Sequence, residues 1–336
     1  MSAPYFGTVR DHRCVSWRNI ESFASKNTAS ITEDRYNRDP TSVMDLKAYL
    51  RSRQKKIDRA LDRYLPRANT KPATLHKAMR YSLFAGGKRL RPILCLAATE
   101  ACRGNIDGAL PLACALECIH TYSLVHDDLP SMDNDDFRRG RPTCHKVFGE
   151  GIAILAGDAL LTIAFEIVST AKPAHRYNIS ALLHEIAVAA GSQKLIAGQV
   201  ADLEAEGKDV KRDQLQFIHE NKTAAILNSS VRLGAMSANA DARKLSAITR
   251  FGQRLGLAFQ IIDDILDVTQ TSEILGKSAG KDAAAKKATY PAVIGLEESR
   301  AEARRLTRQA HNALSVFGSD AEPLHVLANY LLEREY

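Results

Sequence analysis

Two clusters of aspartate contain the side chains best suited to bind a metal ion. The second cluster, Asp263-Asp264-Ile265-Leu266-Asp267, follows an apolar stretch that runs from Leu255 to Ile262. Helical residues four apart differ by about 40° around the axis, so Asp263 and Asp267 would share a face while Asp264 points about 100° away. Neighbouring carboxylates repel one another unless a cation neutralises them, and hard oxygen ligands suit Mg²⁺ that bridges to phosphate groups. A solvated acidic face is the alternative for this cluster taken alone.

The first cluster, Asp127-Asp128-Leu129-Pro130-Ser131-Met132-Asp133, is less regular and more informative. Pro130 cannot continue a regular helix, and six residues do not return to the same helical face, so a helix must end or distort there. Further acids follow at Asp135 and Asp136, and Phe137-Arg138-Arg139-Gly140-Arg141 then puts cations beside them. Surface salt bridges would explain this charge balance, but not why two acid clusters each end an apolar helix.

A third motif, Gly86-Gly87-Lys88-Arg89-Leu90-Arg91-Pro92, joins two glycines to three cations. Glycine allows close backbone approach, and forked guanidinium groups bind diphosphate oxygens two at a time. A glycine pair that ends a helix among basic residues is the competing interpretation.

These motifs need rigid elements to position them, and the sequence pattern supplies helices. The 336 residues are 45% hydrophobic and 25% charged, which is too apolar for a disordered chain. Residues 1–42 have no sustained apolar period and are interpreted as a loosely ordered N-terminal extension, whereas residues 43–336 read as one all-α domain. Long helices are expected at Leu110–Asp128, Ala153–Ser169, Ala181–Ala201, Leu215–Met236 and Leu245–Val268.

Charge and cysteine usage exclude several other classes of protein. The net charge of +7 suits polyanionic partners, but the cations are spread along the chain without a zinc-finger or RNA-binding signature, so nucleic-acid binding is not expected. The six cysteines include no CxxC, which favours buried thiols in a reducing compartment. No apolar run reaches roughly 18 residues and no signal-peptide core is present, so we expect a cytoplasmic protein without stable membrane insertion.

Taken together, the motifs resemble the trans-isoprenyl diphosphate synthases, and specifically the bacterial-type farnesyl diphosphate synthases. The two aspartate motifs, GGKRLRP and Ala156-Gly157-Asp158 occur in the family's order within residues 70–336. The resemblance implies an isoprenoid synthase-type helical bundle around a deep central cavity, with the aspartate motifs facing each other across its mouth. It also implies a homodimer.

The resemblance further implies roles for individual residues. Asp127, Asp133 and Asp263 would bind three Mg²⁺ ions, and Asp128, Asp264 and Asp267 would join directly or through water. The positions that match contacts to the allylic diphosphate are Arg138, Lys222, Thr223, Gln260, Lys277 and Lys287. Those that match contacts to isopentenyl diphosphate are Lys88, Arg91, His120 and Arg139. Isopentenyl diphosphate would add to the ionised allylic substrate, dimethylallyl and then geranyl diphosphate, and the departed pyrophosphate would take the proton.

Product length is expected to depend on Tyr122 and its neighbour Ser123. Tyr122 lies five residues before Asp127, about 7.5 Å down a helix. In the family, a bulky aromatic residue there together with the insertion Pro130-Ser131 goes with a fifteen-carbon product, although a tyrosine can also be plain core packing.

Three rival functions stay open at this point. The first is a synthase that makes geranyl or geranylgeranyl diphosphate, and the second is a non-catalytic subunit of a heteromeric synthase. The third, a terpene cyclase, would require a different second motif. Two departures from the family bear on substrate closure: the chain ends Glu333-Arg334-Glu335-Tyr336 where a basic tail is common, and Ala288 replaces a Ser or Thr.

Overall fold

The computed structural model describes residues 44–269 and 288–332. The predicted N-terminal extension, residues 1–42, lies outside the described part of the chain. The α-helices, in order, are α2 (Leu46–Tyr64), α3 (Ala73–Leu83), α4 (Leu90–Ala101), α5 (Ile106–Asp127), α6 (Cys144–Phe148), α7 (Glu150–Ser169), α8 (Ile179–Ala190), α9 (Leu195–Ala205), α10 (Arg212–His219), α11 (Ala225–Ser237), α12 (Ala242–Thr269), α15 (Tyr290–Ile294), α16 (Leu296–Ala313) and α17 (Glu322–Leu332). They are joined by the π-helix η2 (Glu220–Ala224), the 3₁₀-helix η3 (Leu314–Ala321) and a hairpin of β1 (Phe137–Arg138) and β2 (Arg141–Pro142). The all-α prediction is confirmed.

Helix α5 forms the centre of the bundle. Its side chains from Ala109 to Ile119 are all buried, and it packs against α4, α7 and α11. A helix that is apolar around its whole circumference must be covered on every side, which is what the sequence predicted for this segment. Its N-terminus is capped by the Asn105 side chain, which accepts a hydrogen bond from the Asp107 N–H at 3.0 Å. The first aspartate motif therefore starts from a fixed element.

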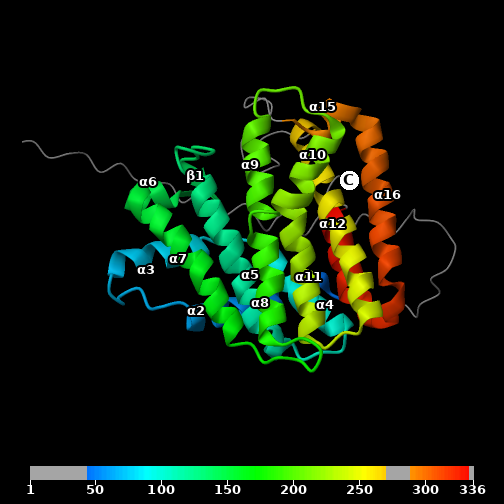
Figure 1. Ribbon diagram of the computed structural model, residues 1–336, viewed down its shortest axis with the longest axis horizontal. Helices are drawn as coiled ribbons and strands as arrows, with labels where there is room; N and C mark the ends of the chain where they lie inside the picture. Colours follow the sequence, from blue (N-terminus) through cyan, green and yellow to red (C-terminus); the bar gives the residue numbers. More distant parts are fainter. Residues whose placement is uncertain (1–43, 270–287, 333–336) are drawn as a thin grey trace, which may run out of the picture.

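Helix α12 carries the second motif and lies on the other side of α11, which contacts both α5 and α12 (Figure 1). Helix α16 packs along the outer side of α12, and α17 returns to contact α4. The hairpin that follows α5 and the short helix α15 that follows α12 both lie in the upper part of Figure 1. The two motif-bearing helices thus deliver their acids toward the same end of the bundle.

The prediction of one helix over Ala181–Ala201 is wrong, because α8 ends at Ala190 and α9 begins at Leu195. Gly191 takes an extended conformation with ψ −172°, and glycine gains little from remaining helical. The predicted Leu215–Met236 helix is likewise divided into α10, the π-helix η2 and α11. Apolar periodicity continues through both interruptions, so it did not reveal them.

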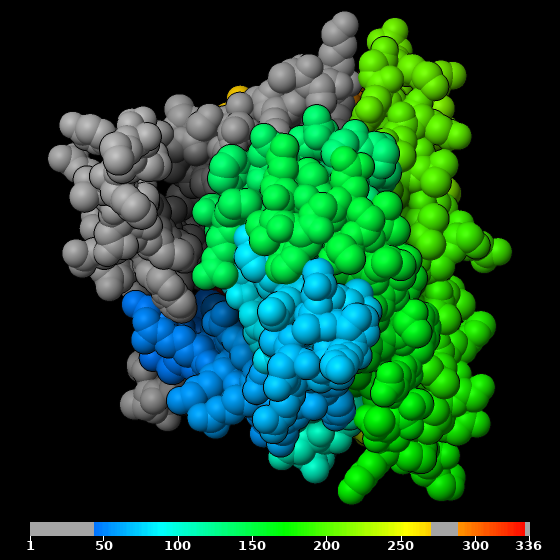
Figure 2. Space-filling view, turned by 90° about the vertical axis from the view of Figure 1, so that its left-hand side faces the viewer, coloured from blue at the N-terminus to red at the C-terminus, as the bar shows by residue number. Residues whose placement is uncertain are grey.

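On the side of the molecule shown in Figure 2, α2 and α3 lie below the start of α7, and α3 contacts both α6 and α7. By length and mean hydropathy alone, α5 and α7 could each cross a membrane. The apolar window of α5 is 78% buried inside the fold, which identifies α5 as a core helix, whereas that of α7 is only 44% buried. Helix α7 therefore keeps an uncovered apolar face in the single chain.

Candidate active site

The chain reverses direction immediately after α5, as Pro130 predicted. The Asp133 N–H donates to the Asp127 carbonyl at 2.8 Å, and the Asn134 N–H donates to the Leu129 carbonyl at 3.1 Å. These bonds fold the two inserted residues outward and return Asp133 to the end of the helix. The first and last acids of the motif are thereby held close together, although six residues separate them.

Asp128 is bound by a forked pair of hydrogen bonds from Arg138. The Arg138 Nε lies 2.7 Å and 2.9 Å from the two Asp128 carboxylate oxygens, and Asp128 is only 3% exposed. Burial raises the pKa of Asp128, and Arg138 opposes that effect. The hairpin β1–β2 thus presents Arg138 toward the first aspartate motif, where Asp128 is its partner.

The carboxylate of Asp127 lies in a less favourable electrostatic environment than that of Asp128. Burial raises the pKa of Asp127 to about 6, the nearby Lys222 ammonium opposes the shift, and the carboxylates of Asp133 and Asp128 add to it. Crowded carboxylates of this kind are relieved by a divalent cation. In residues 44–269 and 288–332, no three His, Cys, Asp or Glu side chains converge enough to hold a metal alone. The neighbouring carboxylates of Asp127 and Asp133 are hard oxygen ligands of the kind that suit Mg²⁺, which usually takes one or two carboxylates and completes its shell with water and substrate phosphates.

Lys222 and Thr223 lie on the π-helix η2, whose backbone is in close contact with a glycine on each of two sides. A Cβ on Gly198 of α9 would lie 2.1 Å from the Lys222 backbone nitrogen, and one on Gly256 of α12 would lie 2.5 Å from the Ala224 Cβ. Short π-helical segments such as η2 are common at functional sites, because they change the direction in which a side chain points. The Lys222 Nζ bonds to the Asp202 carboxylate at 2.5 Å and lies near enough to Asp127 to lower its pKa.

The second motif divides its three acids between two environments. Asp263 and Asp267 share the half-buried face of α12, and Asp263 is close enough to Arg91 to oppose the lowering of its pKa that burial causes. Asp264 is buried, as its position about 100° away predicts, and it accepts hydrogen bonds from His219 and from the Tyr290 backbone. Gln260 lies one turn before Asp264 on the same helix and is half-buried. Lys277 and Lys287 lie outside the described residues.

Facing these acids is a group of crowded cations. Burial lowers the pKa of Arg91 to about 10; Glu117 opposes this shift and the nearby Arg139 adds to it. The pKa of His120 is held well below its usual range by burial and then by Arg91 and Arg139, so this imidazole is neutral at pH 7. The buried Arg91 Nε has no hydrogen-bond partner in the described chain. Like charges at close range with unused donors form a site for a polyanion.

The glycines of the third motif leave space for the guanidinium of Arg139. Its guanidinium donates to the Gly86 carbonyl, and a Cβ on Gly87 would lie 2.5 Å from the Arg139 Nη1. Close backbone approach was predicted for these glycines, and the group that approaches is an arginine of the distant hairpin. Lys88 is exposed, and its ammonium lies 5.5 Å from the ring centroid of Tyr330 on α17.

Arg89, the remaining cation of the motif, has a different task. Its side chain is 3% exposed and donates to Glu117 at 2.9 Å, to Asp58 of α2 at 2.9 Å and to the Leu83 carbonyl at 2.8 Å. Three acceptors on three segments hold the loop that carries Lys88 and lead it into α4. Arg89 therefore fixes the loop and does not face the polyanion site.

Tyr122 lies one and a half turns before Asp127 and is 6% exposed. Its ring packs edge-on against the His126 ring at a centroid distance of 5.8 Å. His126 in turn packs against Gly157 of α7, where an added Cβ would lie 2.1 Å from the His126 Nε2. Ser123 is half-buried and donates to the His120 carbonyl at 2.9 Å. Gly157 of the Ala156-Gly157-Asp158 motif thus brings α7 against the wall below the first aspartate motif.

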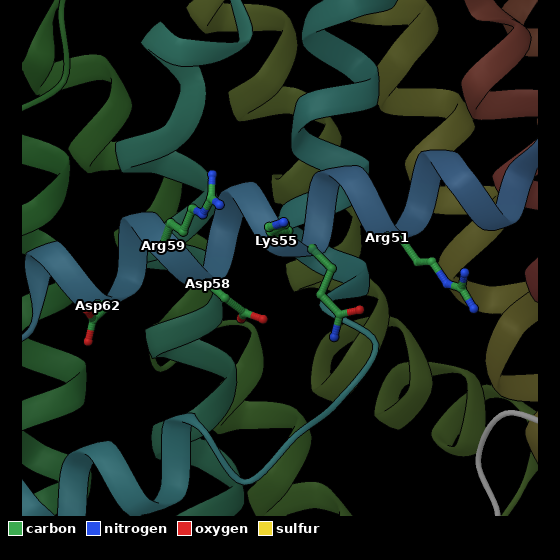
Figure 3. A pocket seen from close by; sticks show the side chains of 6 residues that line it. Arg51, Lys55, Asp58, Arg59 and Asp62 are labelled. Atoms are coloured by element: carbon green, nitrogen blue, oxygen red, sulfur yellow. The ribbon is translucent and has the colours of Figure 1, made fainter.

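A separate groove of about 530 Å³ is lined by side chains of α2 (Figure 3). Figure 3 shows Asp58 and Asp62 projecting to one side of α2 and Arg59 to the other. Two of its residues support the third motif, because Asp58 bonds to Arg89 and the Gln54 amide donates to the Gly87 carbonyl at 3.0 Å. The groove is therefore the outer surface of the part of α2 that holds the third motif in place.

Sequence reasoning missed Asp202, His219 and Gln199. Asp202 pairs with Lys222, His219 binds Asp264, and the buried Gln199 Nε2 has no partner in the part of the chain that the structure describes. The available signal was the run Gly198-Gln199-Val200-Ala201-Asp202, a glycine followed by two polar residues within an otherwise apolar helical pattern.

Comparison with known proteins identifies the same family that the sequence motifs resemble. The family model described as polyprenyl synthetase matches residues 72–316. The chain is 46% identical over 329 residues to the heterodimeric geranylgeranyl pyrophosphate synthase large subunit 1 of Arabidopsis thaliana, covering 95% of this chain and 88% of the relative. It is 50% identical over 299 residues to the geranylgeranyl pyrophosphate synthase of Catharanthus roseus, covering 88% and 83%.

Solved structures agree on the fold. A putative farnesyl-diphosphate synthase from Marinomonas sp. MED121 has a TM-score of 0.75 and 40% identity, covering 86% of this chain and all of that one. A geranyltransferase from Helicobacter pylori, complexed with magnesium and isoprenyl diphosphate, has a TM-score of 0.76 and 32% identity, covering 87% and 99%. This chain therefore belongs to the polyprenyl synthetase family and is a trans-isoprenyl diphosphate synthase, a prenyltransferase of the all-α fold.

Proposed function

We propose that this protein makes farnesyl diphosphate, by condensing isopentenyl diphosphate first with dimethylallyl and then with geranyl diphosphate. The observation that carries the proposal is the buried ring of Tyr122, which lies on the α5 wall below Asp127 and is braced by His126. A rigid aromatic ring at that depth would stop the growing chain. Helix α5 is covered by neighbours along its length, so the ring has little room to move aside.

In this mechanism the acids hold one diphosphate and the cations hold the other. Asp127, Asp133, Asp263 and Asp267 would bind three Mg²⁺ ions, and bound Mg²⁺ supplies Lewis-acid assistance to the departure of the allylic diphosphate. Lys222 of the π-helix directs its ammonium toward the same diphosphate, with Asp202 holding the side chain in place.

Isopentenyl diphosphate would bind to Arg91, Arg139, His120 and Lys88 without a metal. The neutral His120 contributes an N–H donor without adding a further cation to a crowded group. The isopentenyl double bond attacks the allylic carbocation, and the proton lost from the product goes to the departed pyrophosphate.

Geranylgeranyl diphosphate is the second candidate product, and sequence similarity favours it. The relatives from Arabidopsis thaliana and Catharanthus roseus, at 46% and 50% identity, are named for the twenty-carbon product. A dimethylallyltranstransferase from Fischerella ambigua is equally similar, at 47% identity. Overall identity is set mainly by the shared fold and diphosphate sites, whereas product length depends on the few residues of the wall.

Replacing Tyr122 with alanine should lengthen the products, because it removes the ring that closes the wall. Purified protein with Mg²⁺ and isopentenyl diphosphate would be given dimethylallyl, geranyl or farnesyl diphosphate in turn, and the products identified by chromatography. We expect farnesyl diphosphate from the wild type and products of twenty carbons or more from the variant. Tyr177→Ala, a change to a tyrosine far from the motif, controls for general loosening.

A wild type that extends farnesyl diphosphate efficiently would favour the twenty-carbon assignment. Unchanged product lengths in Tyr122→Ala would remove this residue as the floor of the pocket. Failure of every allylic substrate to react would contradict prenyl transfer itself.

We further propose that the protein is a homodimer that covers the apolar face of α7. Ile154 and Leu155 of α7 are 44% and 55% exposed, and Ile196 and Val200 of α9 are similarly exposed. Large apolar side chains that are exposed next to each other, as Ile154 and Leu155 are, are typical of protein interfaces. A second copy is the simplest partner, because it would offer the same apolar face in return.

The double variant Ile154→Lys/Leu155→Lys should be monomeric, because a charge on each copy would have to be buried in the interface. Light scattering after size-exclusion chromatography would give the mass of the wild type and variant, with Val268→Lys on α12 as a control for an added surface lysine. A wild type that is monomeric at micromolar concentration would contradict the proposal.

A further inference from the structure

Asp264 is the buried acid of the second motif, and one of its carboxylate oxygens is already bound inside the protein. The residue is 8% exposed, and its Oδ2 atom accepts hydrogen bonds from the His219 Nε2 at 2.9 Å and from the Tyr290 N–H at 2.8 Å. A carboxylate oxygen that receives two N–H donors is well satisfied and gains little from turning toward a metal ion.

The two donors come from two different segments of the chain. His219 is the last residue of α10 and directly precedes the π-helix that carries Lys222, whereas Tyr290 opens α15. The His219 and Tyr290 rings also stack on each other at a centroid distance of 5.4 Å with 21° between their planes. One oxygen of Asp264 therefore ties together three segments near the second motif.

Two of these segments lead to groups of the active site. Helix α12 carries Asp263 and Asp267, η2 carries Lys222, and α15 contributes the Tyr290 N–H that fixes Asp264 between them. The π-helix η2 cannot shift freely, because Gly198 and Gly256 hold its backbone at contact distance on both sides. A shift of His219 would therefore move Lys222 relative to the acids it faces.

We propose that His219 and Asp264 act as a positioning pair that fixes the π-turn lysine against the metal-binding acids, and that Asp264 is not itself a metal ligand. The inference rests on the proposed function for the identity of the diphosphate. It assigns a role to His219, and it changes the expectation that Asp264 joins the metal directly or through water. Groups that orient the ligands of a metal site typically change affinity or activity about 10- to 100-fold when removed.

Four variants separate positioning from ligation. Asp264→Asn keeps an oxygen that can accept both N–H donors but loses the charge that a metal ligand needs, and Asp263→Asn is the matched change at an expected ligand. His219→Phe keeps the stacked ring and removes the donor, whereas His219→Gln restores a donor near the position of Nε2. His76→Phe, which removes a comparable imidazole hydrogen bond to the Thr70 carbonyl, controls for the loss of a histidine.

Calorimetric titration with Mg²⁺ and inorganic pyrophosphate would measure ligand binding without turnover. We expect Asp264→Asn to bind nearly as well as the wild type and Asp263→Asn to bind far more weakly. His219→Phe should lose about 10- to 100-fold in kcat/KM, and His219→Gln should recover most of that loss. Asp264→Asn and Asp263→Asn that are equally impaired would overturn the proposal, as would a fully active His219→Phe.

Amide hydrogen exchange tests the same pair independently of any substrate. The Tyr290 N–H should exchange faster in His219→Phe and Asp264→Leu than in the wild type, measured by mass spectrometry on a peptide that begins several residues before Tyr290 and ends at Gly295. Unchanged protection in both variants would overturn the positioning role even if the wild type proved to bind no diphosphate. The proposed function and the positioning pair can therefore fail separately.

Discussion

Replacing Asp127 with asparagine should lower kcat by at least about 100- to 1,000-fold, the loss typical of removing one group that stabilises charge in a transition state. The end of α5 holds this carboxylate beside Asp133 and opposite Lys222, where substitution leaves the backbone turn intact. Steady-state kinetics at saturating Mg²⁺ would measure the effect, with Asp209→Asn on an exposed loop as the control. Activity within tenfold of the wild type would show that Asp127 is not a principal ligand.

The same substitution should make the protein without metal more stable near neutral pH. The carboxyl of Asp127 has its pKa raised from 3.8 to about 6, so the folded state binds this proton more tightly than the unfolded state does. A raised carboxyl pKa means that stability falls as pH rises from about 4 to 6, and asparagine removes that loss. The gain at pH 7 is on the order of 2 kcal/mol, since each pKa unit corresponds to about 1.4 kcal/mol and nearby water reduces the effect.

Urea unfolding at pH 4 and pH 7, with EDTA present, would test this dependence. The wild type and Asp127→Asn should differ little at pH 4 and clearly at pH 7. By the same reasoning, Mg²⁺ should bind more weakly to the wild type as pH falls below about 6, because protons then compete for the carboxylate. A variant that is less stable at pH 7 would contradict the raised pKa.

Replacing Gly198 with alanine should damage both stability and activity through a single methyl group. The new Cβ would lie 2.1 Å from the Lys222 backbone nitrogen and 2.6 Å from its Cα, and backbone atoms cannot rotate away as a side chain would. Overpacking of this kind costs about 1–3 kcal/mol and sometimes more. If α9 moves to relieve the clash, the pairing of Lys222 with Asp202 is disturbed as well.

Gly108→Ala is the matched control, because no atom lies within 4 Å of a Cβ built there and the residue is also helical. That variant should be as stable as the wild type or slightly more stable, since alanine favours a helix over glycine. Urea unfolding and kcat/KM would be measured on both variants. A Gly198→Ala protein that matches Gly108→Ala in both measurements would show that α9 and the π-turn are not closely coupled.

The sequence predicted much of the fold because the relevant signals are local. The buried character of α5, its end near the start of the first aspartate motif and the turn at Pro130 all follow from side-chain type and proline geometry, and the structure has each of them, although α5 ends at Asp127 and not at the predicted Asp128. The division of the second motif into a half-buried pair on one face and a turned-away Asp264 also follows from helical spacing.

What the sequence did not reveal depends on contacts between distant residues. Arg89 and Arg91 are two positions apart in one motif, yet Arg89 binds Glu117 and Asp58 while the Nε of Arg91 has no described partner. Only the packing of α2 and α5 around the loop separates their roles. The π-helix η2 was hidden for a related reason, because the residues packed against it, Gly198 and Gly256, belong to other helices.

The contact between Lys88 and Tyr330 has a consequence for the order in which the fold is completed during synthesis. Lys88 lies just before α4, but the ring that it contacts belongs to α17, much later in the chain, and α17 packs against the same α4. The ribosome therefore releases α5 and its acids well before the segment that carries Tyr330. We expect the surroundings of Lys88 to form only after α17 has emerged.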